Sequence, residues 1–215
     1  MSTTHSPRPL AQMALADLLD AFASNEPVPG GGSAAALAGA LGASLLIMVA
    51  GLPRTKTGAP EEAADLAEAS ARLRPIRDSL LALVDEDSRA YTAVLQARRL
   101  PQETEAEKKR RYDAVDAAMR EATRVPMDTM RGCQQALRGA MTVAESGNAN
   151  AATDTGTAVQ LLIAGVRSAG MNVDVNLRSV SDAAFAERTA AERRALTQDA
   201  EPDARRVLDH LDLRT

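Results

Sequence analysis

PVPGGGSAAALAGALGASLLIMVAGL, residues 27–52, contains no charged side chain and is the stretch that decides the fold. Its prolines and glycines favour a turn, and Ser33 stands where a helix N-cap belongs, so the pattern predicts a helix over Ser33–Leu52. A helix that is uncharged on every face is typically buried, and we expect this one to be central and buried on all sides. A single membrane span is the alternative. Alanine, glycine and serine fill much of the stretch, which favours a core helix over that alternative.

The three glycines before this helix form a candidate ligand-binding loop. Glycine lets a ligand approach bare backbone, and the unpaired N–H groups of a helix start favour an anion nearby. Gly30, Gly31, Gly32 and Ser33 are therefore candidate binding residues. An ordinary glycine-rich turn that starts a buried helix is the alternative.

The rest of the composition is typical of packed helices. Only 2% of the 215 residues are aromatic, whereas sheets favour aromatic and β-branched residues. The net charge of −4 comes from interspersed charges of both signs, without the basic stripe typical of nucleic-acid binding. We expect one all-α domain over residues 1–215, a helical bundle around a buried Ala/Gly-rich central helix, with residues 1–9 as a flexible tail.

Apolar periodicity and capping residues predict the other helices of this bundle. The helix that begins near Thr104 is either kinked at Pro126 or replaced there by a second helix. Residues 172–176 alternate in polarity and are too few to decide between a helix and a short extended piece. The predicted helices are 10–23, 61–99, 104–124, 126–145, one from about 150 into the 170s, one that begins after Ser181-Asp182, and 201–213.

The chain has few residues for metal binding or nucleophilic catalysis. Cys133 is the only cysteine, which excludes an intrachain disulfide, and its helical surroundings predict a small buried residue. The two histidines, His5 and His210, lie near opposite termini, so we expect no metal site. Proton chemistry must then come from carboxylates, lysine, tyrosine or water. Residues 1–9 are polar and proline-rich, and no secretory signal is expected.

An apolar heptad stripe in the predicted helix 61–99 points to one carboxylate. The members of the stripe are Leu66, Leu73, Leu80 and Val94. Asp87 takes the skipped position on this stripe, whereas Asp85 and Glu86 point elsewhere and are expected to be solvated. A carboxylate among apolar residues is expected to have a raised pKa, which suits a general acid or base. The alternative is a structural carboxylate that pairs with an arginine or caps a neighbouring helix.

Asp154, Asn172 and Asn176 belong to one predicted helix and lie near one face of it. Asp154 and Asn172 are five turns apart, about 27 Å if the helix is continuous, so both cannot touch one reacting atom. They then line different parts of a long ligand or serve different sites. The alternatives are helix-dipole complementation for Asp154 and capping for the asparagines.

Motifs along most of the chain resemble one enzyme family. The segment LLDAFASNEPVPGGGSAAALAGALGASLLIMVAGL, residues 18–52, is similar to the opening of the cyclodeaminase/cyclohydrolase family. That family includes the cyclodeaminase half of formiminotransferase-cyclodeaminase and stand-alone methenyltetrahydrofolate cyclohydrolases. The resemblance covers roughly residues 18 to 185, about four-fifths of the chain. It continues through Val84–Tyr91, Val125-Pro126, Gly147–Asn150, Thr153–Gly156 and Asn172–Leu177.

The resemblance implies an enzyme of folate one-carbon metabolism, with a tetrahydrofolate derivative as substrate and no further cofactor or metal. Asp87 or Asp154 would be the general acid/base, and Lys56 would contact the substrate's carboxylate tail or hold the reacting group. The resemblance also implies a cytoplasmic homodimer with its site in the groove between subunits, and contact with neither membrane nor nucleic acid. The residues expected to bind polar edges of the ligand are Gly30, Gly31, Gly32, Ser33, Asn148, Asn172 and Asn176.

One loop departs from the family pattern, and the exact activity stays open. Thr55 and Thr57 flank Lys56 where the family usually shows a glycine and a second lysine. Because the chain has no room for a formiminotransferase domain, hydrolysis of 5,10-methenyltetrahydrofolate to 10-formyltetrahydrofolate is favoured. Ammonia-releasing cyclodeamination of formiminotetrahydrofolate is the first alternative. A non-catalytic folate-binding bundle is the second.

Overall fold

The computed structural model describes residues 8–213, and these residues form helices and no strand, as predicted. Residues 1–7, which hold His5 and most of the predicted flexible tail, lie outside the described residues. The elements are η1 (Leu10–Gln12), α1 (Leu15–Ala23), α2 (Gly31–Ala50), α3 (Pro60–Arg98), α4 (Glu105–Ser146), η2 (Ala149–Ala151), α5 (Ala152–Leu177) and α6 (Ala183–His210).

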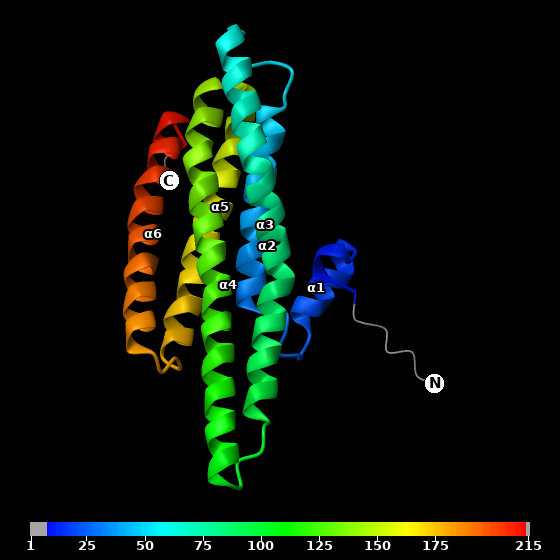
Figure 1. The fold of residues 1–215 in the computed structure, drawn as a ribbon. Helices are drawn as coiled ribbons and strands as arrows, with labels where there is room; N and C mark the ends of the chain where they lie inside the picture. The colour runs from blue at the N-terminus through cyan, green and yellow to red at the C-terminus, as the bar shows by residue number, and fades with distance from the viewer. Residues whose placement is uncertain (1–7, 214–215) are drawn as a thin grey trace.

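Four long helices make the bundle, and each packs against two others around one core (Figure 1). α2 lies between α3 and α5, and α4 lies between the same two helices on the opposite side. α6 packs on α4 and α5, while η1 contacts α3. α3 and α4 extend beyond the first turn of α2, so their connecting loop projects from one end of the bundle (Figure 1).

α2 is a corner helix, so the prediction that it is buried on all sides is wrong. Its inner face packs closely, since a Cβ on Gly42 would lie 2.8 Å from the carbonyl oxygen of Ala158 in α5. Its outer face is uncovered in this chain, where Leu41 is 51% and Met48 41% exposed. Within residues 8–213, Gly31–Ala50 is the one helix long and apolar enough to cross a membrane, a test that core helices of soluble proteins also pass.

Several predicted boundaries differ from the structure. Gly30 is the N-cap of α2, and the predicted cap Ser33 lies inside the first turn. Residues 10–23 divide into a 3-10 turn and a helix. Residues 172–176, for which the sequence leaves helix and extended chain open, are helical. α4 runs unbroken through Pro126, and α6 runs through Pro202 in place of a separate helix over 201–213.

A contact between helices compensates for Pro126 in α4. Proline has no N–H, so it leaves the carbonyl of the residue four positions earlier, Ala122, without its helical donor. The side-chain amide of Asn176 in α5 donates to that carbonyl at 2.7 Å. Because the buried acceptor is satisfied from a neighbouring helix, α4 continues through the proline.

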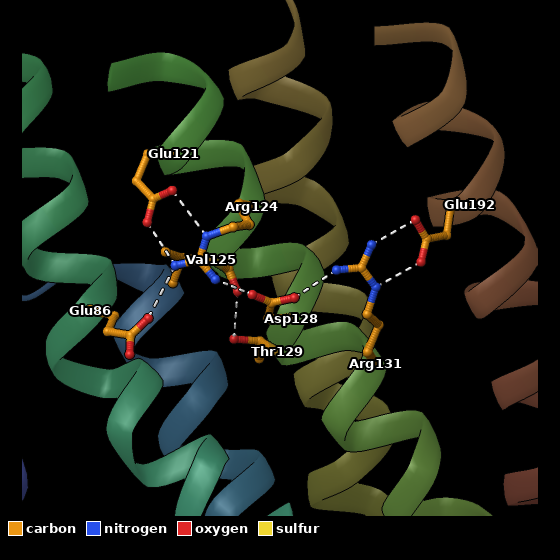
Figure 2. Close-up of polar contacts among 8 residues, drawn as sticks. All are labelled: Glu86, Glu121, Arg124, Val125, Asp128, Thr129, Arg131 and Glu192. Carbon is orange, nitrogen blue, oxygen red and sulfur yellow. Dashed lines mark hydrogen bonds and ion pairs between the residues drawn. The ribbon is translucent and has the colours of Figure 1, made fainter. Parts of the chain in front are cut away.

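An ion-pair network joins α3, α4 and α6 on the outside of the bundle (Figure 2). Arg124 of α4 pairs with Glu86 of α3 at 3.3 Å, and also with Glu121 and Asp128 of its own helix. Arg131 pairs with Asp128 at 2.6 Å, and both of its hydrogen bonds to Glu192 of α6 are 2.7 Å. Glu86 therefore ties two helices together, which corrects the expectation that it is only solvated.

Candidate functional site

Asp87 of α3 reaches across to the first turn of α2. The backbone N–H of Ser33 donates to Asp87 Oδ2 at 2.8 Å, and Ser33 Oγ lies 3.1 Å from the same oxygen. Ser33 Oγ also donates to the carbonyl of Val84 at 2.8 Å and lies 3.1 Å from Ser88 Oγ. Asp87 thus lies on the apolar seam of α3 as predicted. The Ser33 hydroxyl is beside its carboxylate, and the Ser88 hydroxyl contacts that of Ser33.

The Asp87 carboxylate occupies the anion position at the start of α2. A Cβ on Gly32 would lie 2.0 Å from Asp87 Oδ1, so only glycine leaves room for this approach. The Ser33 N–H, one of the groups that the sequence offers to an external anion, donates instead to a carboxylate of the same chain. Asp87 therefore caps the start of α2, as the structural alternative for this residue predicts. A carboxylate that caps a helix can still transfer a proton.

Burial raises the pKa of Asp87 above its ordinary value, although the hydrogen bonds from Ser33 act in the opposite direction. The expected direction of the shift is confirmed, and desolvation is its cause. A carboxyl with a raised pKa exchanges protons closer to neutral pH than an ordinary aspartate does.

Asn172 joins Asp87 and the glycine loop at the same end of the bundle. A Cβ on Gly31 would lie 4.0 Å from Asn172 Nδ2, which places the amide next to the start of α2. Asn172 donates one hydrogen bond to the carbonyl of Ser168 at 2.9 Å and retains further hydrogen-bonding capacity. The amide of Asn176, one turn further on, is used by Ala122 as described above, so its structural role is evident and its ligand-binding role stays a prediction.

Lys56, Asn148 and Asp154 lie at the opposite end of α2 and α5. Lys56 and Asn148 line one cavity of about 190 Å³, together with Thr155 and His210. Asn148 caps η2 through a 2.9 Å hydrogen bond from the Asn150 N–H to its side-chain oxygen. Asp154 is in the first turn of α5, and within residues 8–213 its carboxylate has no hydrogen bond or ion pair.

The two threonines that depart from the family pattern fold the Lys56 loop around one carboxylate. Thr55 Oγ1 donates to Glu62 at 2.6 Å, and the Thr57 N–H and hydroxyl each donate to it at 2.9 Å. The hydrogen bond from Thr55, followed by that from the Thr57 N–H, lowers the pKa of Glu62 to about 2. Lys56 itself is exposed, and its backbone N–H donates to the carbonyl of Ser146 at 2.9 Å.

Sequence reasoning missed four residues around these two ends of the bundle, namely Ser88, Glu62, His210 and Asp85. Ser88 follows Asp87 directly and has no pattern of its own. Glu62 follows Thr57 by five and Thr55 by seven positions, which is not the spacing of a capping box, so no local pattern points to it. His210 lies 154 residues from Lys56, and no local pattern links them. Asp85, expected to be solvated, accepts from the Leu10 N–H at 2.6 Å and fixes η1 on α3.

One chain does not bring all the predicted site residues together. α2 has 20 residues, so about 30 Å separates the Asp87 end from the Lys56 end. α5 is continuous from Ala152 to Leu177, which confirms that Asp154 and Asn172 lie five turns apart. Gly30, Gly31, Gly32, Ser33, Asp87 and Asn172 form one group, and Lys56, Asn148 and Asp154 form the other.

Other reactive groups in the described chain offer no second site of this kind. Cys133 is buried as predicted, and burial raises the pKa of its thiol to about 12. Within residues 8–213 no cluster of three or more His, Cys, Asp or Glu side chains is arranged to hold a metal ion.

Comparison with known proteins places these features in a family. Residues 14–195 match the family model described as formiminotransferase-cyclodeaminase. The chain is 40% identical over 182 residues to a protein of Methylorubrum extorquens named methenyltetrahydrofolate cyclohydrolase, across 85% of this chain and 88% of that one. It is 35% identical over 190 residues to mouse formimidoyltransferase-cyclodeaminase, 86% of this chain but only 34% of that protein.

A solved structure shares the fold. The crystal structure of formiminotetrahydrofolate cyclodeaminase from Thermotoga maritima superimposes with a TM-score of 0.83 and 28% identity, over 94% of this chain and 96% of that one. The sequence matches and the shared fold extend over nearly all the described helices, and the chain belongs to the formiminotransferase-cyclodeaminase family.

Proposed function

We propose that this protein hydrolyses 5,10-methenyltetrahydrofolate to 10-formyltetrahydrofolate, with Asp87 as the general acid/base. The observation that carries the proposal is the partly buried Asp87 carboxylate at the start of α2, which accepts from the N–H of Ser33, has the Ser33 hydroxyl beside it and has a raised pKa. The 40% identity to a protein named methenyltetrahydrofolate cyclohydrolase, over 88% of that protein, supports the choice of reaction.

The proposed reaction needs one group that first accepts and then donates a proton. Water adds to the cationic methenyl carbon, a C–O bond forms, and Asp87 accepts a proton from that water. Asp87 then returns this proton to N5 as the C–N5 bond breaks, and the remaining hydroxyl proton leaves to solvent. The products are neutral 10-formyltetrahydrofolate and one proton, so atoms and charge balance. A negative carboxylate also stabilises the positive amidinium before attack.

Asp87 is favoured over Asp154 because burial raises the pKa of Asp87 and because the Ser33 N–H donates to its carboxylate. Asp154 lies at the far end of α5, about 27 Å away along the helix from Asn172. In the proposal Asn172 and the glycine loop bind polar edges of the ligand near Asp87. Lys56 and Asn148 bind its carboxylate tail at the other end.

We further propose a cytoplasmic homodimer in which the outer face of α2 is covered by a second copy. The residues on this face recur at alternating spacings of three and four, as residues at helix–helix interfaces do. They are Ala34, Leu37, Leu41, Ser44 and Met48. α5 packs beside α2 and exposes Met171 and Val175, by 61% and 58%. A twofold axis across α2 sets the Asp87 end of one copy beside the Lys56 end of the other, and this unites the two groups of site residues.

The test is loss of the methenyl chromophore in the presence of purified protein, measured above the buffer-catalysed rate. We expect turnover in the wild type and a drop of about 100-fold or more in kcat for Asp87→Asn. Asp85→Asn, two residues earlier on α3, is the matched control and should keep near-normal turnover. Circular dichroism establishes that each variant is folded. Full activity in folded Asp87→Asn would remove Asp87 from the mechanism.

Cyclodeamination is the second candidate, because the structurally similar protein from Thermotoga maritima is named a formiminotetrahydrofolate cyclodeaminase. In that reaction the formimino carbon bonds to N10 and ammonia leaves, which again requires proton transfer at nitrogen. Ammonia release from 5-formiminotetrahydrofolate, without hydrolysis of the methenyl compound, would select this candidate. Folate binding without either turnover would identify a non-catalytic bundle.

A further inference from the structure

Lys56 has a partner from the far end of the chain. Its Nζ lies 3.1 Å from Nε2 of His210, which is in the last turn of α6. A lysine ammonium only donates hydrogen bonds, so the imidazole nitrogen Nε2 is the acceptor in this contact. The family match ends at residue 195, fifteen positions before this histidine.

Both residues stand on fixed backbone. The Lys56 loop is tied to the end of α4 by the 2.9 Å bond to Ser146 and is wrapped around Glu62 by Thr55 and Thr57. The end of α6 is held to the bundle by Val207, which is only 1% exposed. A surface lysine normally samples many rotamers, but here its backbone is fixed and its ammonium has an acceptor.

The Lys56–His210 pair borders the 190 Å³ cavity at the start of α5. Asn148 and Thr155 add polar groups to the lining. Pockets that enclose a whole drug-sized ligand usually measure about 300–1,000 Å³, so this cavity fits one end of a ligand. The cation at its edge suits a carboxylate.

We infer that His210 is a positioning residue that holds the Lys56 ammonium toward this cavity for the carboxylate end of the substrate. The inference rests on the proposed folate-hydrolysing function for the identity of that carboxylate, but the contact itself is a property of this chain. His210 acts through Lys56, and it raises affinity because the lysine no longer has to be ordered when the ligand binds.

A kinetic experiment separates positioning from chemistry. We expect His210→Ala to raise KM for methenyltetrahydrofolate by about 2- to 10-fold with kcat retained. His210→Gln, whose amide oxygen also accepts a hydrogen bond, should restore most of the affinity. Arg206→Ala, one turn earlier on α6 and paired with Asp203, is the matched control and should behave as wild type.

A double mutant tests whether His210 acts through Lys56. In a Lys56→Met background His210→Ala should add no further rise in KM, because no ammonium remains to be positioned. An equal rise in both backgrounds would overturn the inference, and so would unchanged KM in the single variant.

A second readout does not depend on turnover. The chain has three lysines, Lys56, Lys108 and Lys109, so ¹³C-dimethylated protein gives few lysine signals. Lys108 pairs with Glu105 and Lys109 with Asp113, which makes them internal references. His210→Ala should move only the Lys56 signal, assigned with Lys56→Arg. A shifted signal in an inactive protein would contradict the proposed function alone, whereas an unmoved signal would overturn the positioning role.

Discussion

Asp87 Oδ1 occupies the space in which any residue other than glycine at position 32 would place its Cβ. The separation would be 2.0 Å, shorter than van der Waals contact allows, so Gly32 and Asp87 are sterically coupled across α2 and α3. The carboxylate thus gains its hydrogen bonds from Ser33 only because the neighbouring position has no side chain.

Gly32→Ala should therefore displace the Asp87 carboxylate. We expect a lower kcat together with a loss of about 1–3 kcal/mol in the free energy of unfolding, as for other overpacked core positions. Gly51→Ala, just after the other end of α2, is the control, because its Cβ would meet nothing closer than the Ile47 carbonyl oxygen at 3.4 Å. Steady-state kinetics and urea unfolding measure the two effects. Equal behaviour of the two variants would mean that the carboxylate does not need this space.

Asn176→Ala should destabilise the bundle by about 1–3 kcal/mol, because it leaves the Ala122 carbonyl without a donor. In a Pro126→Ala background the same substitution should cost less, since alanine at 126 supplies the helical N–H that proline lacks. Urea unfolding of the four proteins measures the coupling. Additive free energies would show that the asparagine does not compensate for the proline.

Glu62 should give the protein an acid-sensitive loop. Its hydrogen bonds hold the folded pKa at about 2, below the ordinary value of 4.5. The lowered pKa adds stability above the ordinary value, and this contribution is lost as pH falls toward 2. Glu62→Gln should show a shallower loss of stability over that interval than wild type, measured by urea unfolding at several pH values. Glu61→Gln, at the adjacent exposed position, serves as the control and should follow the wild-type curve.

Leu41→Glu should dissociate the proposed dimer. The side chain is 51% exposed in the single chain, so a glutamate there is tolerated by the folded monomer but not inside a helix–helix seam. Light scattering should report a change from two copies to one, with loss of turnover. Tyr112→Glu, at a 60% exposed position in α4, is the control. A wild-type protein that is already monomeric would exclude the dimer.

Local patterns in the sequence predict the inward-facing residues of this fold well. The uncharged stretch 27–52 predicts α2, and the heptad stripe of α3 places Asp87 on its seam with the correct direction of pKa shift. Both depend on spacing within one helix, which the chain alone defines.

Contacts between distant segments explain the failures. Pro126 was a reasonable break point, but the donor that rescues Ala122 comes from Asn176, 54 residues away. Ser33 has the chemistry of an N-cap, yet a carboxylate from α3 takes over that role and leaves Gly30 at the cap. The outer face of α2 is uncovered because the fold sets this helix at a corner, and composition does not encode which face points outward.

The length of α2 also bears on how this protein diversifies. Within one chain, residues about 30 Å apart share no neighbours, so substitutions around Lys56 and around Asp87 should add independently in their effects on the folding of that chain. Substitutions in the loop after α2 and at the end of α6 could then change which ligand tail binds. The Ser33–Asp87 contact at the reacting end would stay unchanged. Related proteins with different substrates can arise on this scaffold by changes confined to one end.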